Sequence, residues 1–413
     1  SCIEVDSISL ASYSSNGYSD YGRRTSIDNG VIFSTDCSNN NIPLSERLAL
    51  IELYKQCKAA PTQVWTNWDT NANSYSNAGS WMGVVTDTIN GQKHVVKLVM
   101  PGQYLKDTIP TSIKNLAYLN EVRFEGYDYH GSFNSYGEGF GYLGRLKKWS
   151  MIGFSGETIP ADSLVSLEEI NAYSSSVSRR NRIKYLPSSF ADLPKLKILN
   201  LSYNLLDSLP ANFGDLDSLE TLTLSQNNLT SLPDGFGDLK SIKSLTIDGG
   251  AYSNNGTQQG NKLKTLPQNF GDLSTLEILR LNTNKIDSLP DSFGNLSSLK
   301  TLYLSGQREY ISGNYTYYLK YIPASFANLT NMQNLYLDNN QYLGELDLSQ
   351  MVNLNTLNLG YNLLFGLKLP TPIDNSISSY YLVNNSYLSC IEVDSISLAS
   401  YSSNGYSDYG RRT

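Results

Sequence analysis

The sequence is poor in the residues from which catalytic and metal sites are usually built. It has only two histidines, His94 and His130, and four cysteines without any C-x-x-C spacing, so it lacks the common zinc-binding patterns. It also lacks G-x-S-x-G, H-E-x-x-H and a phosphate-binding glycine loop. We therefore expect no enzymatic activity, no metal ion and no cofactor.

Charge and long apolar runs are scarce as well. Charged residues make up 17% of the chain, the net charge is −7, and no basic run occurs, which argues against a nucleic-acid partner. No apolar stretch approaches the roughly 18 residues of a transmembrane helix, and the first residues are not a signal peptide. The 30 tyrosines among many Ser, Asn and Gly favour a weakly charged polar surface of the kind common outside cells.

One phrase recurs along the middle of the chain. Copies that begin at Leu196, Leu219 and Leu276 read L-x-x-L-x-L-x-x-N, and Leu-Pro followed by Phe-Gly-Asp-Leu stands between them. The prolines at 187, 210 and 233 lie 23 residues apart, whereas two later steps of 34 and 33 residues carry insertions of roughly ten residues. Each copy is therefore one coil of a solenoid.

The position of each residue in the phrase predicts where its side chain lies in the coil. L-x-L is a short strand whose leucines point inward, and stacking of the coils makes the core. The terminal asparagine turns the chain and satisfies buried backbone groups. Its column is Asn204, Asn227, Asn284, Asn340, Asn362 and Asn385. The pattern resembles leucine-rich repeat proteins, which implies an α/β fold: a solenoid of about twelve coils with a parallel β-sheet on its concave face.

The two ends of the sequence are identical. Residues 389–413 repeat residues 1–25 letter for letter, so the period is 388 residues. We interpret the chain as one module of a tandem array plus the start of the next. A single duplication of a cap segment is the alternative.

This period predicts the domain organisation. Residues 1–37 are the C-terminal cap of a preceding module, 38–94 an N-terminal cap, 95–388 the solenoid and 389–413 the start of the next C-terminal cap. The 1–37 segment resembles the caps of secreted and surface leucine-rich repeat proteins of Bacteroidota-type bacteria. We expect a Cys2–Cys37 disulfide with Cys57 as a buried thiol, and Cys390 as the copy of Cys2. Reduced core cysteines are the alternative.

The predicted N-terminal cap begins with a helix from Pro43 to about Cys57. Its apolar face consists of Leu44, Leu48, Ile51 and Tyr54. Asn90-Gly91 between two β-rich runs predicts a hairpin. The cap tryptophans, Trp65, Trp68 and Trp81, suit packing, with sugar stacking as the alternative.

Two sets of side chains are candidates for binding. The residues between the two strand leucines form a concave column, and its members are Arg123, Ser150, Asn171, Asn200, Thr223, Thr246, Arg280, Tyr303, Tyr336, Asn358 and Tyr381. Three insertions at 125–139, 249–262 and 306–318 form edge loops suited to lateral contacts. Their tyrosines are Tyr127, Tyr129, Tyr136, Tyr252, Tyr310, Tyr315, Tyr317 and Tyr318. Solubility for the column and tolerated decoration for the loops are the alternatives.

These features predict a non-enzymatic extracellular protein at a bacterial cell surface. As a tandem array it would build a filament or appendage for attachment, and its partners would be identical modules in the same chain and other copies of the chain. The alternative is a recognition module that binds a cell-surface glycan or protein on its concave face.

Overall fold

The computed structural model describes residues 2–4, 32–34, 42–58, 81, 83–100, 104–105, 107–125, 133–135, 138–152, 156–160, 163–174, 181–252, 258–311, 313–342, 344–370 and 379–392. The chain forms two compact units, the first from residues 1–156 and 160–167 and the second from residues 157–159 and 168–413. The repeat pattern does not predict this division. The predicted cystine, Cys2–Cys37, lies outside the described side chains, as do Cys57, Trp65 and Trp68.

The first unit combines one α-helix with a small mixed sheet. The helix α2 spans Leu44–Gln56. The sheet runs β4 (Val84–Ile89), β5 (Gln92–Met100), β8 (Glu121–Glu125) and β10 (Lys148–Ile152), antiparallel in its first pair and parallel thereafter. The unit also contains β1 (Cys2–Glu4), β2 (Ile32–Ser34), β3 (Cys57–Lys58), β6 (Tyr104–Leu105), β7 (Asp107–Thr108), β9 (Phe133–Ser135) and 3-10 helices at Thr111–Asn115 and Glu138–Tyr142.

The predicted hairpin is present between β4 and β5. Asn90 and Gly91 have φ values of 53° and 83°, the left-handed conformations that a tight two-residue turn requires. Strand β5 also pairs in parallel with β8. The predicted boundary between the cap and the solenoid, after residue 94, therefore falls inside a strand.

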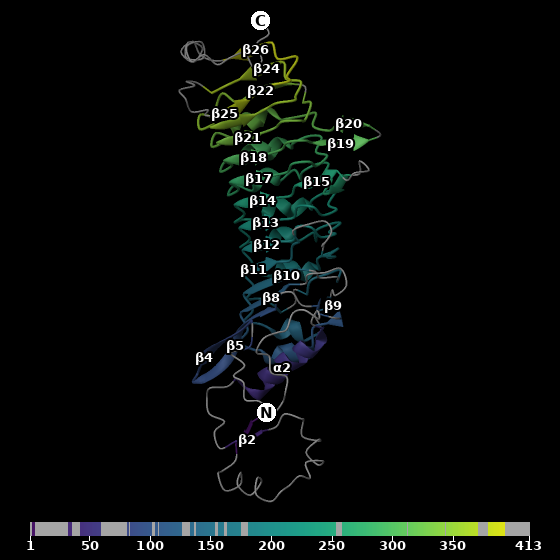
Figure 1. The fold of residues 1–413 in the computed structure, drawn as a ribbon. Coiled ribbons are helices and arrows are strands. Elements are labelled where there is room, and N and C mark those ends of the chain that lie inside the picture. The colour runs from purple at the N-terminus through teal and green to yellow at the C-terminus, as the bar shows by residue number, and fades with distance from the viewer. Residues whose placement is uncertain are drawn as a thin grey trace, which may run out of the picture. The chain divides into compact units, whose positions relative to one another are not determined.

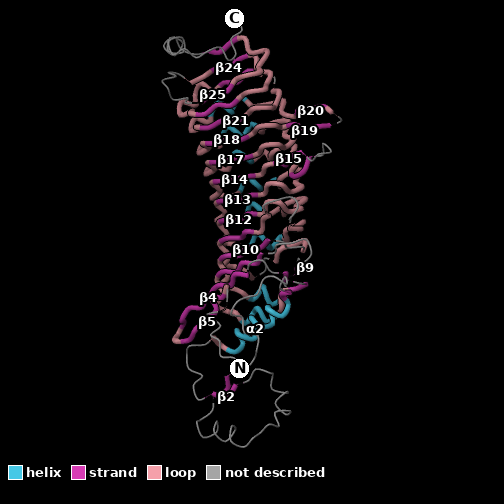
Figure 2. The backbone as a smooth tube through the Cα atoms, viewed as in Figure 1, coloured by secondary structure: helices cyan, strands magenta, loops and turns pink. Residues whose placement is uncertain are grey.

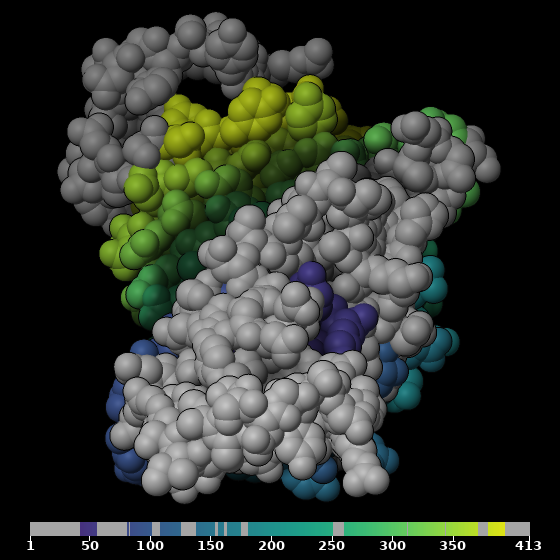
Figure 3. All heavy atoms as spheres, turned by 60° about the horizontal axis from the view of Figure 1, so that its bottom comes forward, coloured from purple at the N-terminus to yellow at the C-terminus, as the bar shows by residue number. Residues whose placement is uncertain are grey.

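The predicted apolar face of α2 was wrong. Leu44 and Leu48 are exposed, and the side chains that point inward are Ala49, Leu50 and Leu53 together with Glu46. Part of the outer side of the helix is visible in purple in Figure 3. The inward face includes a carboxylate, which the apolar pattern could not reveal.

Glu46 is buried because it has partners on β5. One carboxylate oxygen lies 2.6 Å from His94 Nδ1, and the other accepts the Val95 N–H at 2.8 Å. The His94 ring also lies 4.0 Å from the ring of Tyr118. His94 therefore ties the helix to the sheet. Trp81 is also buried, with the Arg47 guanidinium 6.0 Å from its ring, which favours packing over sugar stacking for this tryptophan.

The second unit is a stack of similar coils with one strand each on the same side (Figures 1 and 2). All strand pairs in this sheet are parallel. The strands are β11 (Glu169–Asn171), β12 (Ile198–Asn200), β13 (Thr221–Thr223), β14 (Ser244–Thr246), β17 (Ile278–Arg280), β18 (Thr301–Tyr303), β21 (Asn334–Tyr336), β23 (Thr356–Asn358) and β25 (Ser379–Tyr381). This arrangement confirms the predicted solenoid.

The Leu-Pro and Phe-Gly phrases form the opposite side of the coils. Each proline precedes a 3-10 helical turn, and these turns span Ser188–Asp192, Phe213–Asp215, Asp234–Asp238, Phe270–Asp272, Asp291–Asn295 and Ala324–Asn328. The phenylalanines are buried and stack from coil to coil, with ring centroids 6.2 Å apart for Phe236 and Phe270 and 6.1 Å apart for Phe270 and Phe293. A Cβ on Gly271 would lie 1.8 Å from the carbonyl oxygen of Ser292, so the neighbouring coil requires glycine there.

The asparagine column is buried and links successive coils. Asn227 accepts the Leu206 N–H at 3.0 Å and donates at 2.9 Å to the carbonyls of Leu201 and Leu224. The Leu224 carbonyl in turn receives the Asn261 amide at 2.8 Å. Shared carbonyls of this kind recur along the stack and link most neighbouring amides of the column into a ladder.

Three members of this column were missed by the sequence analysis. In two coils an insertion precedes the asparagine, which moves it to Asn181 and Asn261, and in a third Gln307 replaces it. The signal was present, because both displaced asparagines precede a buried aliphatic residue, Ile183 or Leu263, that stands three residues before Leu-Pro.

In the described part of the chain, the residue before each column amide adopts the left-handed conformation. Tyr203, Gln226 and Thr283 have φ values of 57°, 61° and 56°, and Gly306 has 66°. Only glycine takes this conformation without steric cost, and a β-branched residue such as threonine is an outlier there. The turn after each strand therefore determines the backbone conformation at this position. The conformational preference of the residue that occupies the position does not.

The second unit also contains short strands outside its main parallel sheet. Two antiparallel hairpins, β15 (Gly249–Tyr252) with β16 (Gln258–Gly260) and β19 (Arg308–Ile311) with β20 (Asn314–Tyr317), occupy two predicted insertions and lie on the same side in Figure 1. A second parallel sheet is formed by β22 (Glu345–Asp347), β24 (Gly366–Lys368) and β26 (Cys390–Glu392), in that order.

Candidate functional site

The register places the predicted concave residues in one column. In the second unit, each of nine side chains is paired with the next across neighbouring strands. These are Asn171, Asn200, Thr223, Thr246, Arg280, Tyr303, Tyr336, Asn358 and Tyr381. Arg123 and Ser150 are paired in the same way in the first unit. The geometry of the column is therefore present, while its role in binding stays a prediction.

Arg280, Tyr303 and Tyr336 form a continuous stack within this column. The two tyrosine rings are 4.5 Å apart and within 2° of parallel, and the Arg280 guanidinium carbon lies 4.2 Å from the Tyr303 ring. Parallel strands are spaced about 4.8 Å apart, so identical side chains at paired positions naturally stack face to face. All three side chains are half-buried. The stack presents a cation, ring edges and phenolic groups on a rigid sheet.

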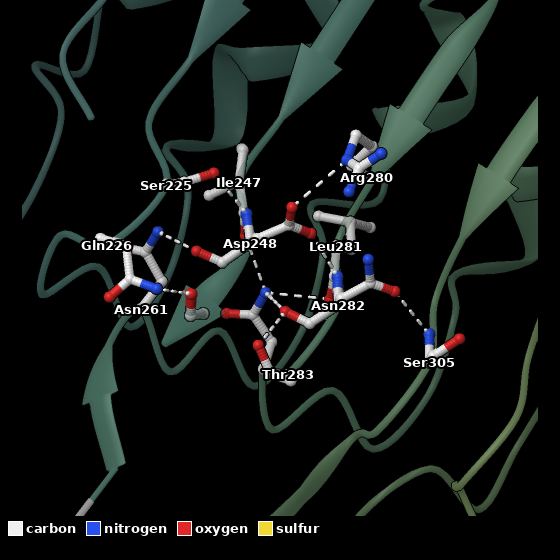
Figure 4. Close-up of polar contacts among 12 residues, drawn as sticks. Ser225, Gln226, Ile247, Asp248, Asn261, Arg280, Leu281, Asn282, Thr283 and Ser305 are labelled. Atoms are coloured by element: carbon white, nitrogen blue, oxygen red, sulfur yellow. Dashed lines mark hydrogen bonds and ion pairs between the residues drawn. The ribbon is translucent and has the colours of Figure 1, made fainter. Parts of the chain in front are cut away.

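Asp248 holds the arginine end of the stack. One of its carboxylate oxygens lies 3.3 Å from Arg280 Nε, and the other accepts the Asn282 N–H at 2.8 Å (Figure 4). Burial raises the pKa of the Asp248 carboxyl, and the charge of Arg280 and the hydrogen bonds from Asn282 and Arg280 offset part of this effect. Asp248 therefore positions Arg280, although burial makes the Asp248 carboxyl group harder to ionise.

The raised pKa of Asp248 gives a pH-dependent prediction. The folded protein retains the carboxyl proton to a higher pH than the unfolded chain does, so this group's stabilising contribution is full below its usual pKa of 3.8 and declines as the pH rises through the folded value. The free energy of unfolding of the wild type, relative to Asp248→Asn, should therefore fall over this window and then level off. Urea unfolding of both proteins at a series of pH values measures the difference. A difference that rises with pH would contradict the sign.

A polar ladder beside the column was missed by the sequence analysis. It occupies the position two residues after the strand, and each member bonds to the next coil: Asn282 Oδ1 accepts the Ser305 N–H at 2.9 Å, and Ser305 Oγ donates to Asp338 at 2.6 Å. Asp338 also accepts the Asn358 amide at 3.0 Å. The available signal was the recurrence of Ser, Asp or Asn directly after L-x-L.

The two ends of the column in the second unit differ in chemistry. From Asn171 to Thr246 the column residues are small and polar, whereas from Arg280 to Tyr381 all except Asn358 carry an aromatic ring or a charge. At the aromatic end, Tyr361 and Tyr381 are 48% and 45% exposed. Arginine and tyrosine are enriched where protein surfaces bind partners. The aromatic and charged residues of the column are therefore concentrated over strands β17 to β25.

Of the predicted lateral tyrosines, the structure describes the side chains on hairpin β19–β20 and the adjoining Tyr318. Tyr310 and Tyr315 are in edge contact at 5.0 Å and are exposed together with Ile311. At its base the hairpin is held by Glu309, which accepts the Tyr318 hydroxyl at 2.8 Å and pairs with Lys285. Tyr127, Tyr129, Tyr136 and the Tyr252 side chain lie outside the described residues.

Among the described residues, no helix is long and apolar enough to cross a membrane. Within the same part of the chain, no three His, Cys, Asp or Glu side chains are grouped in a way that would hold a metal ion.

Comparisons with known proteins agree with this architecture. A family model described as leucine rich repeat matches residues 179–229, 210–250 and 259–308. A search of curated protein sequences gave no match.

Solved structures similar to this chain include leucine-rich repeat proteins. The Arabidopsis thaliana GASSHO1/SCHENGEN3 receptor kinase ectodomain is 21% identical over 84% of this chain and 41% of its own, with a TM-score of 0.56. The PEPR1–AtPEP1 structure is 22% identical over 84% and 52%, with a TM-score of 0.54. A leucine-rich repeat protein of Leptospira interrogans is 25% identical over 72% of each chain, with a TM-score of 0.48. The chain spans less than half of the GASSHO1/SCHENGEN3 chain and about half of the PEPR1 chain.

The L-x-x-L-x-L-x-x-N phrase, the stacked parallel strands, the buried amide ladder and the matching family model agree on one architecture. The fold of this chain is therefore the leucine-rich repeat solenoid.

Proposed function

We propose that this chain is a non-enzymatic recognition protein that binds a protein or peptide ligand on the concave face of its second unit. The observation that carries the proposal is the Arg280–Tyr303–Tyr336 stack, which is ordered by Asp248 before any ligand arrives. Side chains that are already fixed lose little conformational entropy on binding. Leucine-rich repeat folds commonly bind ligands, and the GASSHO1/SCHENGEN3 ectodomain was solved in complex with CASPARIAN STRIP INTEGRITY FACTOR 2.

The chemistry of the stack favours a ligand with an acidic group. Among the described residues, Asp248 engages Arg280 through Nε, and the guanidinium fork has further N–H donors that suit a carboxylate. The tyrosine hydroxyls and ring edges suit the peptide backbone and apolar side chains beside it. We therefore expect acidic peptide segments to bind better than neutral glycans.

Selection with a phage-displayed random peptide library tests this function. Peptides enriched on the wild type should carry Asp or Glu, and their affinity should fall at least about tenfold with Tyr303→Ala/Tyr336→Ala. Thr223→Ala, a substitution in the same column but outside the stack, is the matched control and should leave binding unchanged. Equal loss in the control, or no peptide that depends on the stack, would refute the proposal.

A second candidate function is structural, and the identity of residues 1–25 with 389–413 favours it. Tandem copies would form an extracellular filament or appendage at a bacterial cell surface, attached by avidity to surface glycans or proteins and joined laterally to other copies. Hairpin β19–β20, with Tyr310, Ile311 and Tyr315 exposed, supplies the lateral surface. Electron microscopy of the native protein should show a fibre whose axial repeat equals one module, and single isolated monomers would exclude it.

A further inference from the structure

On the concave face of the second unit, a carboxylate and a tyrosine ring contact the same guanidinium. Arg280 Nε lies 3.3 Å from a carboxylate oxygen of Asp248 (Figure 4), and the guanidinium carbon lies 4.2 Å from the Tyr303 ring. Asp248 stands two residues after β14, and Arg280 and Tyr303 are the paired column residues of β17 and β18. The register therefore builds a site for a cation from one acid and one ring.

The same three positions recur over β21, β23 and β25, with a neutral residue in the middle. Asp338 stands two residues after β21, and Asn358 and Tyr381 are the paired column residues of β23 and β25. Asn358 thus takes the place that Arg280 has in the first arrangement. It is shorter and uncharged, and its amide donates to Asp338 at 3.0 Å. The second arrangement therefore has the acid and the ring without the guanidinium.

The Asp338 carboxylate bonds to neutral groups. Besides the Asn358 amide, it accepts the Ser305 hydroxyl at 2.6 Å and the Asn339 amide at 2.5 Å. In the described part of the chain, no Lys, Arg or His forms an ion pair with it. Asp338 is half-buried, so its charge is screened less by water than that of a fully exposed acid. A cation that reaches it gains a charge-assisted hydrogen bond.

The Tyr381 ring lies close to this acid. Gly360 is next to Asp338 in the following coil, because the Asn339 N–H donates to the Gly360 carbonyl at 2.9 Å, and a Cβ on Gly360 would lie 2.5 Å from Tyr381 Cε1. Burial raises the pKa of the Tyr381 hydroxyl, as do Tyr361 and the negative charge of Asp338. Tyr381 is 45% exposed. A ring beside a carboxylate favours a planar cation, which can stack on the ring and pair with the acid.

We propose that Asp338, Asn358 and Tyr381 bind the guanidinium of an arginine side chain of the ligand. This guanidinium pairs with the Asp338 carboxylate and stacks on Tyr381, as Arg280 does with its own partners in the first arrangement. The proposal deepens the proposed function by naming a second group of the ligand, and it rests on that function only in assigning the arginine to a peptide.

The distance between the two arrangements predicts the spacing in the ligand. Arg280 and Asn358 are three strand steps apart in the sheet. At about 4.8 Å per step this is roughly 14 Å, which an extended peptide covers in about four residues. A peptide that crosses the strands should therefore carry an acidic residue for Arg280 and an arginine about four positions away.

Titration with the capped tripeptide acetyl-Gly-Arg-Gly-amide tests the site directly. Nuclear magnetic resonance of the full chain with labelled tyrosine rings should show a saturable shift of the Tyr381 signals, which Tyr381→Phe identifies. The same peptide with citrulline, a neutral analogue of arginine, should cause no shift. Asp338→Asn should weaken binding at least about tenfold. Asp287→Asn, which removes an exposed charge outside the column in the same unit, should leave binding unchanged. Equal losses in the two variants would overturn the proposal.

Asn358→Arg gives a second test that keeps the acid in place. The introduced side chain supplies the cation from the chain itself, in the position that Arg280 has in the first arrangement, so it should block the site. The tripeptide should then no longer shift the Tyr381 signals, while the circular dichroism spectrum stays that of the wild type. Unchanged tripeptide binding in this variant would overturn the proposal.

The peptide selection described above separates this site from the function of the stack. Peptides enriched on the wild type should carry arginine in addition to an acidic residue, and selection on Asp338→Asn should lose the arginine alone. Acidic peptides enriched without arginine would overturn the proposal and leave the function of the stack standing. A tripeptide that binds at Tyr381 when no stack-dependent peptide is found would refute only that function.

Discussion

Asn227→Ala should lower the free energy of unfolding by about 3 kcal/mol, because it removes the hydrogen bonds of a fully buried amide. The Leu206 N–H loses its acceptor at 3.0 Å and has no solvent to replace it. The carbonyls of Leu201 and Leu224 each lose one of two amide donors, since Asn204 and Asn261 also bond to them. The unsatisfied N–H therefore supplies the largest part of the loss.

The neighbouring Asn228 offers a matched control. It is exposed, and its amide makes only long contacts of 3.5 and 3.4 Å to Leu205 and Asp207. Asn228→Ala should therefore change stability by less than about 0.5 kcal/mol. Urea denaturation followed by circular dichroism measures both variants. Similar effects at the two positions would show that the amide ladder contributes little to the stability of the stack.

Phe270→Ala should destabilise the protein by about 3 to 5 kcal/mol, the usual range for removing a buried phenylalanine. The ring is fully buried between Phe236 at 6.2 Å and Phe293 at 6.1 Å, so its loss leaves a cavity that borders two coil interfaces. Coils of a solenoid contact only their neighbours, and no distant part of the chain can fill the space.

Phe365→Ala is the control for this substitution. Phe365 lies in the same unit but is 49% exposed, so truncation should cost well under the amount expected at Phe270, about 1 kcal/mol or less. Thermal and urea unfolding of the two variants decide between the cases. If Phe270→Ala were as mild as Phe365→Ala, the phenylalanine stack would be a consequence of coil packing and not a main source of it.

The sequence predicted the solenoid and its columns because each coil repeats a local pattern. An inward leucine, a turn asparagine and a proline before a helical turn recur at fixed spacing, so one correctly assigned coil assigns most of the others. The prediction failed where the spacing changed. Asn181 and Asn261 were missed because insertions displaced them, although the residues that follow each of them keep the pattern.

The prediction of the apolar face of helix α2 failed for a different reason. Its apolar residues Leu44 and Leu48 are exposed, and the inward face is decided by Glu46, which bonds to His94 and Val95 on a strand nearly fifty positions away. A buried carboxylate is stable only with such partners, and no local pattern identifies them. The candidate site was also predicted only in part, because some of its contacts join residues that no local pattern connects. The column of Arg280, Tyr303 and Tyr336 followed from the period, but the role of Asp248 did not.

By itself, the sequence determined that the chain is a solenoid, which residues line its core, and which side chains share a column, because these properties follow from a repeated period and from the alternation of a strand. The tertiary structure decided which members of the column touch, how Asp248 orients Arg280, and that the duplicated strand has one partner as β1 and another as β26. These facts depend on contacts between coils and between paired strands, where distance in space bears no relation to distance along the chain.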